Sequence, residues 1–218
     1  MTDWLLWQIV DSAFPTGGFA HSWGLESAWQ HGEVRDARAL RRFVRQTIVQ
    51  TGRGVMPLVT AAHRAPDRLG ALDALADAFL TNVVANRASR VQGRTLAATA
   101  RRVWPSPATE DVERCALAGC AHVAPVTGAA LAAIGVPLEA AERLVLFIAA
   151  RGVLSSAVRL GLVGSYEAQR LTHDCADEAD DVWRTCRGLH AGDIAQTTPV
   201  IDLWQAAHGR LYSRLFQS

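Results

Sequence analysis

The sequence of 218 residues contains no lysine, because all 22 of its basic residues are arginine. A nucleotide-binding P-loop uses a lysine for the β- and γ-phosphates, and Schiff-base enzymes use a lysine amine, so both classes are excluded. The sequence also lacks the HExxH pattern of zinc proteases, the GxSxG nucleophile elbow, and a GxGxxG turn that follows a strand. We therefore expect a protein that is not an enzyme and binds no cofactor.

Little in the composition favours nucleic acid or a membrane as a partner. The formal net charge is only +1, and no run of about 18 uninterrupted apolar residues is present. The first residues lack the basic region of a signal peptide. The cysteines are few for a chain of this length and indicate free thiols in a reducing cytoplasm: Cys115, Cys120, Cys175 and Cys186.

These thiols, together with the histidines, offer little support for a metal site. Cys115, Cys120 and His122 form one group and His173 with Cys175 another, but neither spacing matches a structural zinc pattern. We interpret them as small buried thiols and surface histidines and predict no metal ligand. Imidazole suits Ni²⁺, so a transient nickel contact stays open.

Apolar residues recur with the period of α-helices, and no segment alternates as a strand does. Helices are predicted over residues 22–28, 36–52, 67–80, 82–102, 109–118, 127–134, 137–152, 153–162 and 166–186. Asp36 and Thr109 are the predicted N-caps, and Gly52 and Gly152 the predicted helix ends. The prediction is a single all-α domain over residues 1–218, a bundle of roughly eight to ten helices, with 209–218 as a candidate partner-binding tail.

The most distinctive stretch is residues 11–26, in which a proline and a pair of glycines separate two apolar segments. Pro15 fixes its own φ angle, and Gly17 and Gly18 permit backbone angles that a Cβ would forbid. The pattern predicts a helix–turn–helix corner in which Gly17 and Gly18 form a turn that needs a positive φ angle. His21 in this stretch is either a hydrogen-bonded structural residue or a ligand or acid–base group.

Several charged residues have two interpretations each. Glu26, on the helix after the corner, is either a solvated helix residue or part of an interface. Arg87, Arg90 and Arg94 recur at i, i+3 and i+7, and they form a stripe that is either solvated or directed at an anionic partner.

The last residues are unusually apolar for a chain end. If they are helical, Leu211, Tyr212, Leu215 and Phe216 lie along one side of the helix, with Arg214 on its flank. Such a tail either folds onto the core of the protein or serves a partner. We predict that it is a partner-binding element.

Four blocks of the sequence, in this order, resemble the UreF family of urease accessory proteins. They are PTGGFAHSWGLE at 15–26, NRASRVQGR at 86–94, SAVRL at 156–160 with Gly164 and Gln169-Arg170, and His208 with YSRLF at 212–216. The resemblance marks these as motif or partner-binding residues: Pro15, Gly17, Gly18, His21, Gly24, Glu26, Arg87, Arg90, Arg159, Gln169, Tyr212, Arg214, Leu215 and Phe216. The chain departs from the family pattern at Met56, Ala85, Leu162 and Ser165.

The resemblance implies an all-α protein that forms a homodimer and has no catalytic activity. It implies a bridge between an accessory protein of the UreD (UreH) type and the GTPase UreG, in a complex that delivers nickel to apo-urease, and a regulatory effect on that GTPase. Two alternatives remain: a diverged helical adaptor that does not act on urease, and a helical metal-dependent enzyme.

Overall fold

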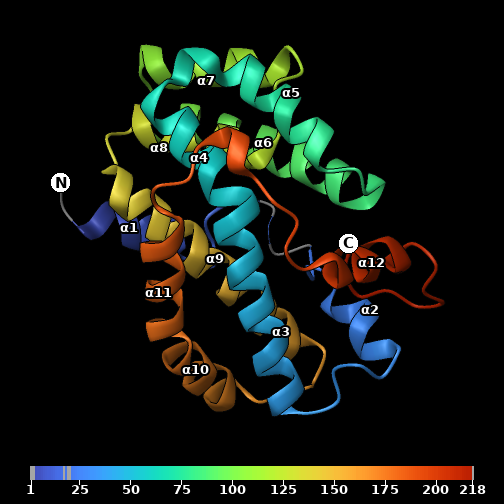
Figure 1. Ribbon diagram of the computed structural model, residues 1–218. Helices are drawn as coiled ribbons and strands as arrows, with labels where there is room; N and C mark the ends of the chain where they lie inside the picture. Colours follow the sequence, from blue (N-terminus) through green and yellow to red (C-terminus); the bar gives the residue numbers. More distant parts are fainter. Residues whose placement is uncertain (1–2, 17, 19–20, 218) are drawn as a thin grey trace.

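Figure 1 shows a computed structural model of the protein, which describes residues 3–16, 18 and 21–217. All regular elements among these residues are helical, which confirms the predicted all-α class. Gly17, one of the motif residues, lies outside the described residues. The α-helices are α1 (Asp3–Val10), α2 (Leu25–Gln30), α3 (Ala37–Gln50), α4 (Met56–Arg64), α5 (Leu69–Phe79), α6 (Val83–Val103), α7 (Pro107–Leu117), α8 (Val123–Ala133), α9 (Leu138–Arg159), α10 (Ser165–Asp174), α11 (Ala176–Cys186) and α12 (Pro199–His208).

The helices form two connected groups and a smaller pair at one side. Helices α5 to α8 pack together at the upper end in Figure 1, and α3, α9, α10 and α11 form the lower part. Helix α4 joins the two groups because it packs against both α8 and α9. At the right side α2 and α12 lie against each other, so elements from the two ends of the chain are neighbours.

The main core lies between α3, α4 and α9. Leu40, Ile48, Met56 and Leu146 are among its fully buried side chains. Burying such a side chain contributes about 1.5–3 kcal/mol, which makes this core the principal source of stability in the fold.

The predicted end of α3 at Gly52 is wrong. The chain continues through a single π-helical turn, Thr51–Val55, directly into α4. The glycine serves a close approach to α11 instead, because a Cβ at Gly52 would lie 2.4 Å from Cγ1 of Val182. The predicted N-cap of α3 is confirmed, since the Asp36 carboxylate accepts a hydrogen bond from the Ala39 N–H at 2.7 Å.

Other predicted boundaries also change. Helix α7 begins at Pro107 and is capped by Ser106, so Thr109 is not its N-cap but the third helical residue in a capping box. Helix α9 continues through Gly152, because tertiary packing on both sides of this buried helix outweighs the low helix propensity of one glycine. The segment predicted as one helix over 166–186 breaks at Cys175 into α10 and α11.

Candidate partner-binding site

The centre of the site is a buried hydrogen-bonded pair, Glu26 and His208, that joins the two ends of the chain. Glu26 on α2 is 2% exposed and His208 at the end of α12 is 1% exposed. The His208 Nε2 lies 2.9 Å from a carboxylate oxygen of Glu26, across 182 residues of sequence. The interpretation of Glu26 as a solvated helix residue is therefore wrong. A carboxylate at this depth needs its partners, because an unpaired buried charge is strongly destabilising.

The C-terminal tail supplies the remaining partners of this carboxylate. The backbone N–H of Leu215 donates to Glu26 at 2.6 Å, and that of Phe216 donates at 3.2 Å. The Phe216 ring is buried, and the Arg159 guanidinium at the end of α9 lies 4.2 Å from the ring centroid. Three blocks of the motif pattern thus converge on one place. The tail is held on its own fold by hydrogen bonds, apolar burial and a cation–π contact.

The other half of the tail faces solvent. The segment after α12 is irregular, so its apolar residues do not line one side of a helix. Tyr212 is fully exposed, Leu215 is 53% exposed, and Arg214 is exposed. The tail therefore combines an anchored residue, Phe216, with outward-facing apolar side chains.

The corner before α2 has left-handed backbone angles at two residues. Gly24 has φ +84° and Trp23 has φ 59°. The predicted positive φ is absent at Gly18, Gly17 lies outside the described residues, and the left-handed glycine of this corner is Gly24, which the sequence analysis did not single out for it. Gly24 also lies against α12, where a Cβ would come within 3.2 Å of Trp204 and Gln205.

His21 is buried in the same region. Burial lowers the pKa of its imidazole, and the nearby His208 lowers it further. A neutral imidazole is therefore favoured in the fold, which fits the structural interpretation of this histidine.

The remaining predicted residues lie elsewhere. Pro15 is exposed, and its carbonyl accepts a hydrogen bond from Thr99 of α6 at 2.8 Å. Gln169 is exposed on α10, and Arg87 is exposed on α6. The structure does not bring these residues to the Glu26 site.

Arg90, predicted as part of a basic stripe, is tied into a partly buried network of side chains from α5, α6 and the start of α8. Its guanidinium lies 2.8 Å from Asp77 and 3.6 Å from Asp73, and it donates to the carbonyl of Gly119. The Asn86 amide, the Arg90 guanidinium and His122 all bond to the Asp77 carboxylate and hold its pKa well below its usual range. Arg90 is therefore a structural residue, whereas Arg87 and Arg94 remain on the surface.

His122 belongs to the same network and is completely buried, so its prediction as a surface histidine is wrong. Its ring lies 3.1 Å from the Ser89 hydroxyl and 3.2 Å from Asp77. Burial lowers the pKa of His122, although the hydrogen bond to Asp77 opposes this. One tautomer satisfies every group: Nε2–H donates to Asp77, and Nδ1 accepts from Ser89.

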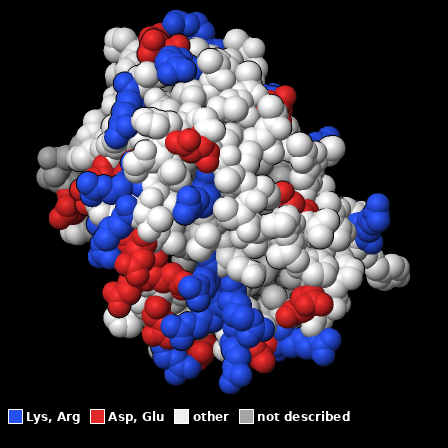
Figure 2. All heavy atoms as spheres, viewed as in Figure 1, with Lys and Arg blue, Asp and Glu red and all other residues white. Residues whose placement is uncertain are grey.

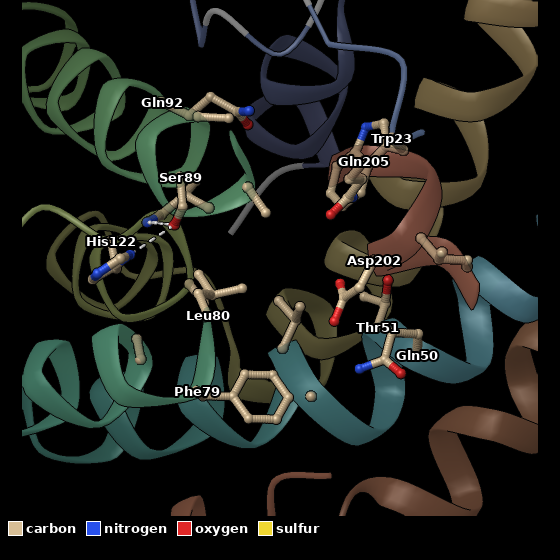
Figure 3. A pocket seen from close by; sticks show the side chains of 18 of the residues that line it. Trp23, Gln50, Thr51, Phe79, Leu80, Ser89, Gln92, His122, Asp202 and Gln205 are labelled. Carbon is tan, nitrogen blue, oxygen red and sulfur yellow. Dashed lines mark hydrogen bonds between the residues drawn. The ribbon is translucent and has the colours of Figure 1, made fainter. Parts of the chain in front are cut away.

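A cavity of about 150 Å³ lies between this network and the motif. Figure 3 shows Ser89 and His122 on one side, Asp202 and Gln205 of α12 on the other, and Trp23, Phe79 and Gln50 around the rim. The sequence offered no signal for this cavity, because its lining comes from helices far apart in the chain.

The surface charges largely neutralise one another. Figure 2 shows arginine and acidic side chains interspersed over the lower part of the molecule, where α3, α10 and α11 lie. Ion pairs join α3 to α11 through Arg45 and Glu178, and α9 to α11 through Arg143 and Asp180.

No group of three or more potential metal-binding side chains occurs among the described residues. None of the helices formed by the described residues is both long enough and apolar enough to cross a bilayer.

The described residues thus form an all-helical scaffold on which an N-terminal motif and the C-terminal tail meet. The chain belongs to the UreF family, whose model matches residues 34–176. It is similar to proteins named Urease accessory protein F, with 37% identity in Arabidopsis thaliana over 99% of this chain and 92% of that protein. The protein of the same name from Oryza sativa subsp. indica is 36% identical over 98% of this chain and 84% of that protein. A Trichodesmium erythraeum protein named Urease accessory protein UreF is 30% identical over 97% of this chain and 94% of that protein.

Proposed function

We propose that this protein acts in the maturation of urease as a bridging factor without catalytic activity of its own. It contacts an accessory protein of the UreD (UreH) type and the GTPase UreG in the cytoplasm, in a complex that delivers nickel to apo-urease. The observation that carries the proposal is the similarity to urease accessory proteins over nearly the whole chain.

The exposed side chains of the C-terminal tail support a contact with the UreD-type protein at this end of the chain. Phe216 anchors the segment on Glu26 and Arg159, and this leaves Tyr212 and Leu215 facing solvent beside Arg214. Apolar side chains displayed on an ordered backbone bind with a smaller entropic cost than those of a disordered end. We assign the UreD-type contact to this surface.

The absence of lysine from the sequence supports a regulatory rather than a hydrolytic relation to GTP. Arg87 and Arg94 are exposed on one face of α6, where they suit an acidic surface. We assign the UreG-type contact to this face. Arg90 takes no part, since its guanidinium is engaged by Asp73 and Asp77.

The test is co-expression of urease and its other accessory proteins with and without this protein. The measured quantities are the nickel content of purified urease and the rate of ureolysis. We expect both to fall to background without this protein. Equal nickel content and activity in the two cultures would overturn the proposal.

A matched pair of variants tests the tail surface. Tyr212→Ser with Leu215→Ser should abolish co-purification with the UreD-type protein and leave the thermal midpoint unchanged, because both side chains are exposed. Tyr166→Ser on α10 removes an equally exposed aromatic ring elsewhere and should leave binding intact. Loss of binding in the control as well would show that the effect is not specific to the tail.

A further inference from the structure

The cavity of about 150 Å³ has an uneven charge distribution. Among the described residues that line it, Asp202 is the only acidic one and none is arginine. The lining histidines, His21 and His122, both have pKa values lowered by burial, so neutral rings are favoured. Among the described lining residues there is thus one carboxyl group and no arginine to pair with it.

The Asp202 carboxylate has no cation to pair with in the described part of the chain. Its side chain accepts a hydrogen bond from the neutral amide of Gln196. Burial raises the pKa of this carboxyl group, and the Gln196 hydrogen bond is the only opposing influence. A half-buried carboxylate in this situation keeps an unfavourable desolvation energy that an incoming cation would offset.

The rest of the cavity lining favours an organic cation over a metal ion. Trp23 and Phe79 present aromatic rings, and Leu58, Leu80 and several alanines supply apolar walls. Aromatic faces attract organic cations, while a divalent metal ion prefers several charged or imidazole ligands. An apolar cavity of about 150 Å³ accommodates a molecule of the size of benzene.

We propose that this cavity is a binding site for a small organic cation, an ammonium or guanidinium compound with an apolar body, whose charge pairs with Asp202. Figure 3 shows the Asp202 carboxylate directed into the cavity, with Trp23 and Gln205 on one side and Gln50 and Thr51 on the other. The amide side chain of Gln205 supplies a hydrogen-bond acceptor for a remaining N–H group of such a ligand, whereas the Gln50 amide oxygen already accepts from Thr197 and Thr198. This site lies apart from the exposed tail surface and does not depend on the proposed function.

The test is isothermal titration calorimetry of the full chain with benzylammonium as the probe, and with benzyl alcohol as its neutral counterpart. We expect one benzylammonium to bind per chain, and the alcohol to bind at least about tenfold more weakly. Equal affinity for the two compounds, or no benzylammonium binding at millimolar concentration, would overturn the proposal.

Two variants test whether benzylammonium binds at Asp202. Asp202→Asn keeps the shape of the side chain and should weaken benzylammonium binding at least about tenfold. Asp174→Asn removes an exposed carboxylate on α10 and should leave the affinity unchanged. Unchanged affinity in Asp202→Asn would contradict the proposal, as would displacement of the probe by micromolar Ni²⁺ alone, which would indicate a metal site.

A second measurement, on the protein without added ligand, separates a binding role from a structural one. If Asp202 serves a ligand, Asp202→Asn removes an unpaired charge, and its thermal midpoint should equal or exceed that of the unmodified protein. A midpoint lowered by several degrees would assign Asp202 to the fold and overturn the ligand role.

Discussion

At the scale of single residues, the corner before α2 is a place where backbone geometry and close packing both restrict the side chain. Gly24 has φ +84°, and a Cβ there would lie 3.2 Å from Trp204 and Gln205 of α12. We expect Gly24→Ala to destabilise the protein by about 1–3 kcal/mol, because strain and crowding add. Urea denaturation measures this difference. Gly188→Ala is the control, since a Cβ there meets no atom within 4 Å, and it should change stability little. Equal effects of the two variants would refute the argument.

The buried histidines predict how stability depends on pH. His21 and His122 have folded-state pKa values below 6.5, the ordinary value. The unfolded chain therefore binds protons first as the pH falls below about 6.5, so stability is full above that pH and is lost on acidification. Each histidine contributes a slope of at most about 1.4 kcal/mol per pH unit.

His122→Asn tests this dependence. The variant is less stable in absolute terms, because it loses the hydrogen bonds to Ser89 and Asp77. Its denaturation midpoint should nevertheless change less than that of the unmodified protein between about pH 7.5 and 5. Identical pH profiles for the two proteins would show that His122 is not held neutral.

At the scale of elements, the C-terminal tail contributes to the stability of the fold. Deleting residues 211–218 removes the buried Phe216 ring and two hydrogen bonds to Glu26. Losing one buried aromatic ring costs about 1.5–3 kcal/mol, which corresponds to several degrees in a domain of this size. Tyr212→Ala, at a fully exposed position, should leave the thermal midpoint unchanged. A truncated protein with an unaltered midpoint would mean that the tail is not docked in solution.

Most helices could be predicted because their signal is local. The apolar stripe lies within α3, and the Asp36 cap immediately precedes that helix. The prediction was wrong where distant contacts decide the geometry. Gly52 is contacted by α11 and therefore does not end a helix.

The arrangement of the candidate site could not be predicted from the sequence, although the motif pattern drew attention to some of its residues. The motif pattern indicated Glu26, Arg159 and Phe216, and the structure places all three together. The pairing of Glu26 with His208 spans 182 residues, and local spacing carries no signal for it. The network of His122 was missed for the same reason, since its partners come from α5 and α6.

At the scale of the whole molecule, the outward face of α1 indicates self-association. Trp4 is 71% exposed and Trp7 is 62% exposed, and their ring centroids lie 6.4 Å apart. On the opposite side of the same helix, Leu5 and Leu6 pack against the core, so the helix is fixed while its tryptophans face solvent. Two adjacent exposed indoles are typical of an interface. We therefore predict that the homodimer expected from the family resemblance uses α1 as part of its contact.

Sedimentation velocity tests this proposal. The unmodified protein should be a dimer at micromolar concentration, and Trp4→Ser with Trp7→Ser should shift it to monomer without changing its helical circular dichroism. The isolated Tyr166 ring on α10 is 95% exposed, so Tyr166→Ser removes a comparable exposed ring far along the chain and should leave the dimer intact. Two buried indoles contribute several kcal/mol to association, because each removes a large apolar area from water. A double variant that remains dimeric would place the contact on another surface, and an unmodified protein that is strictly monomeric would exclude the dimer altogether.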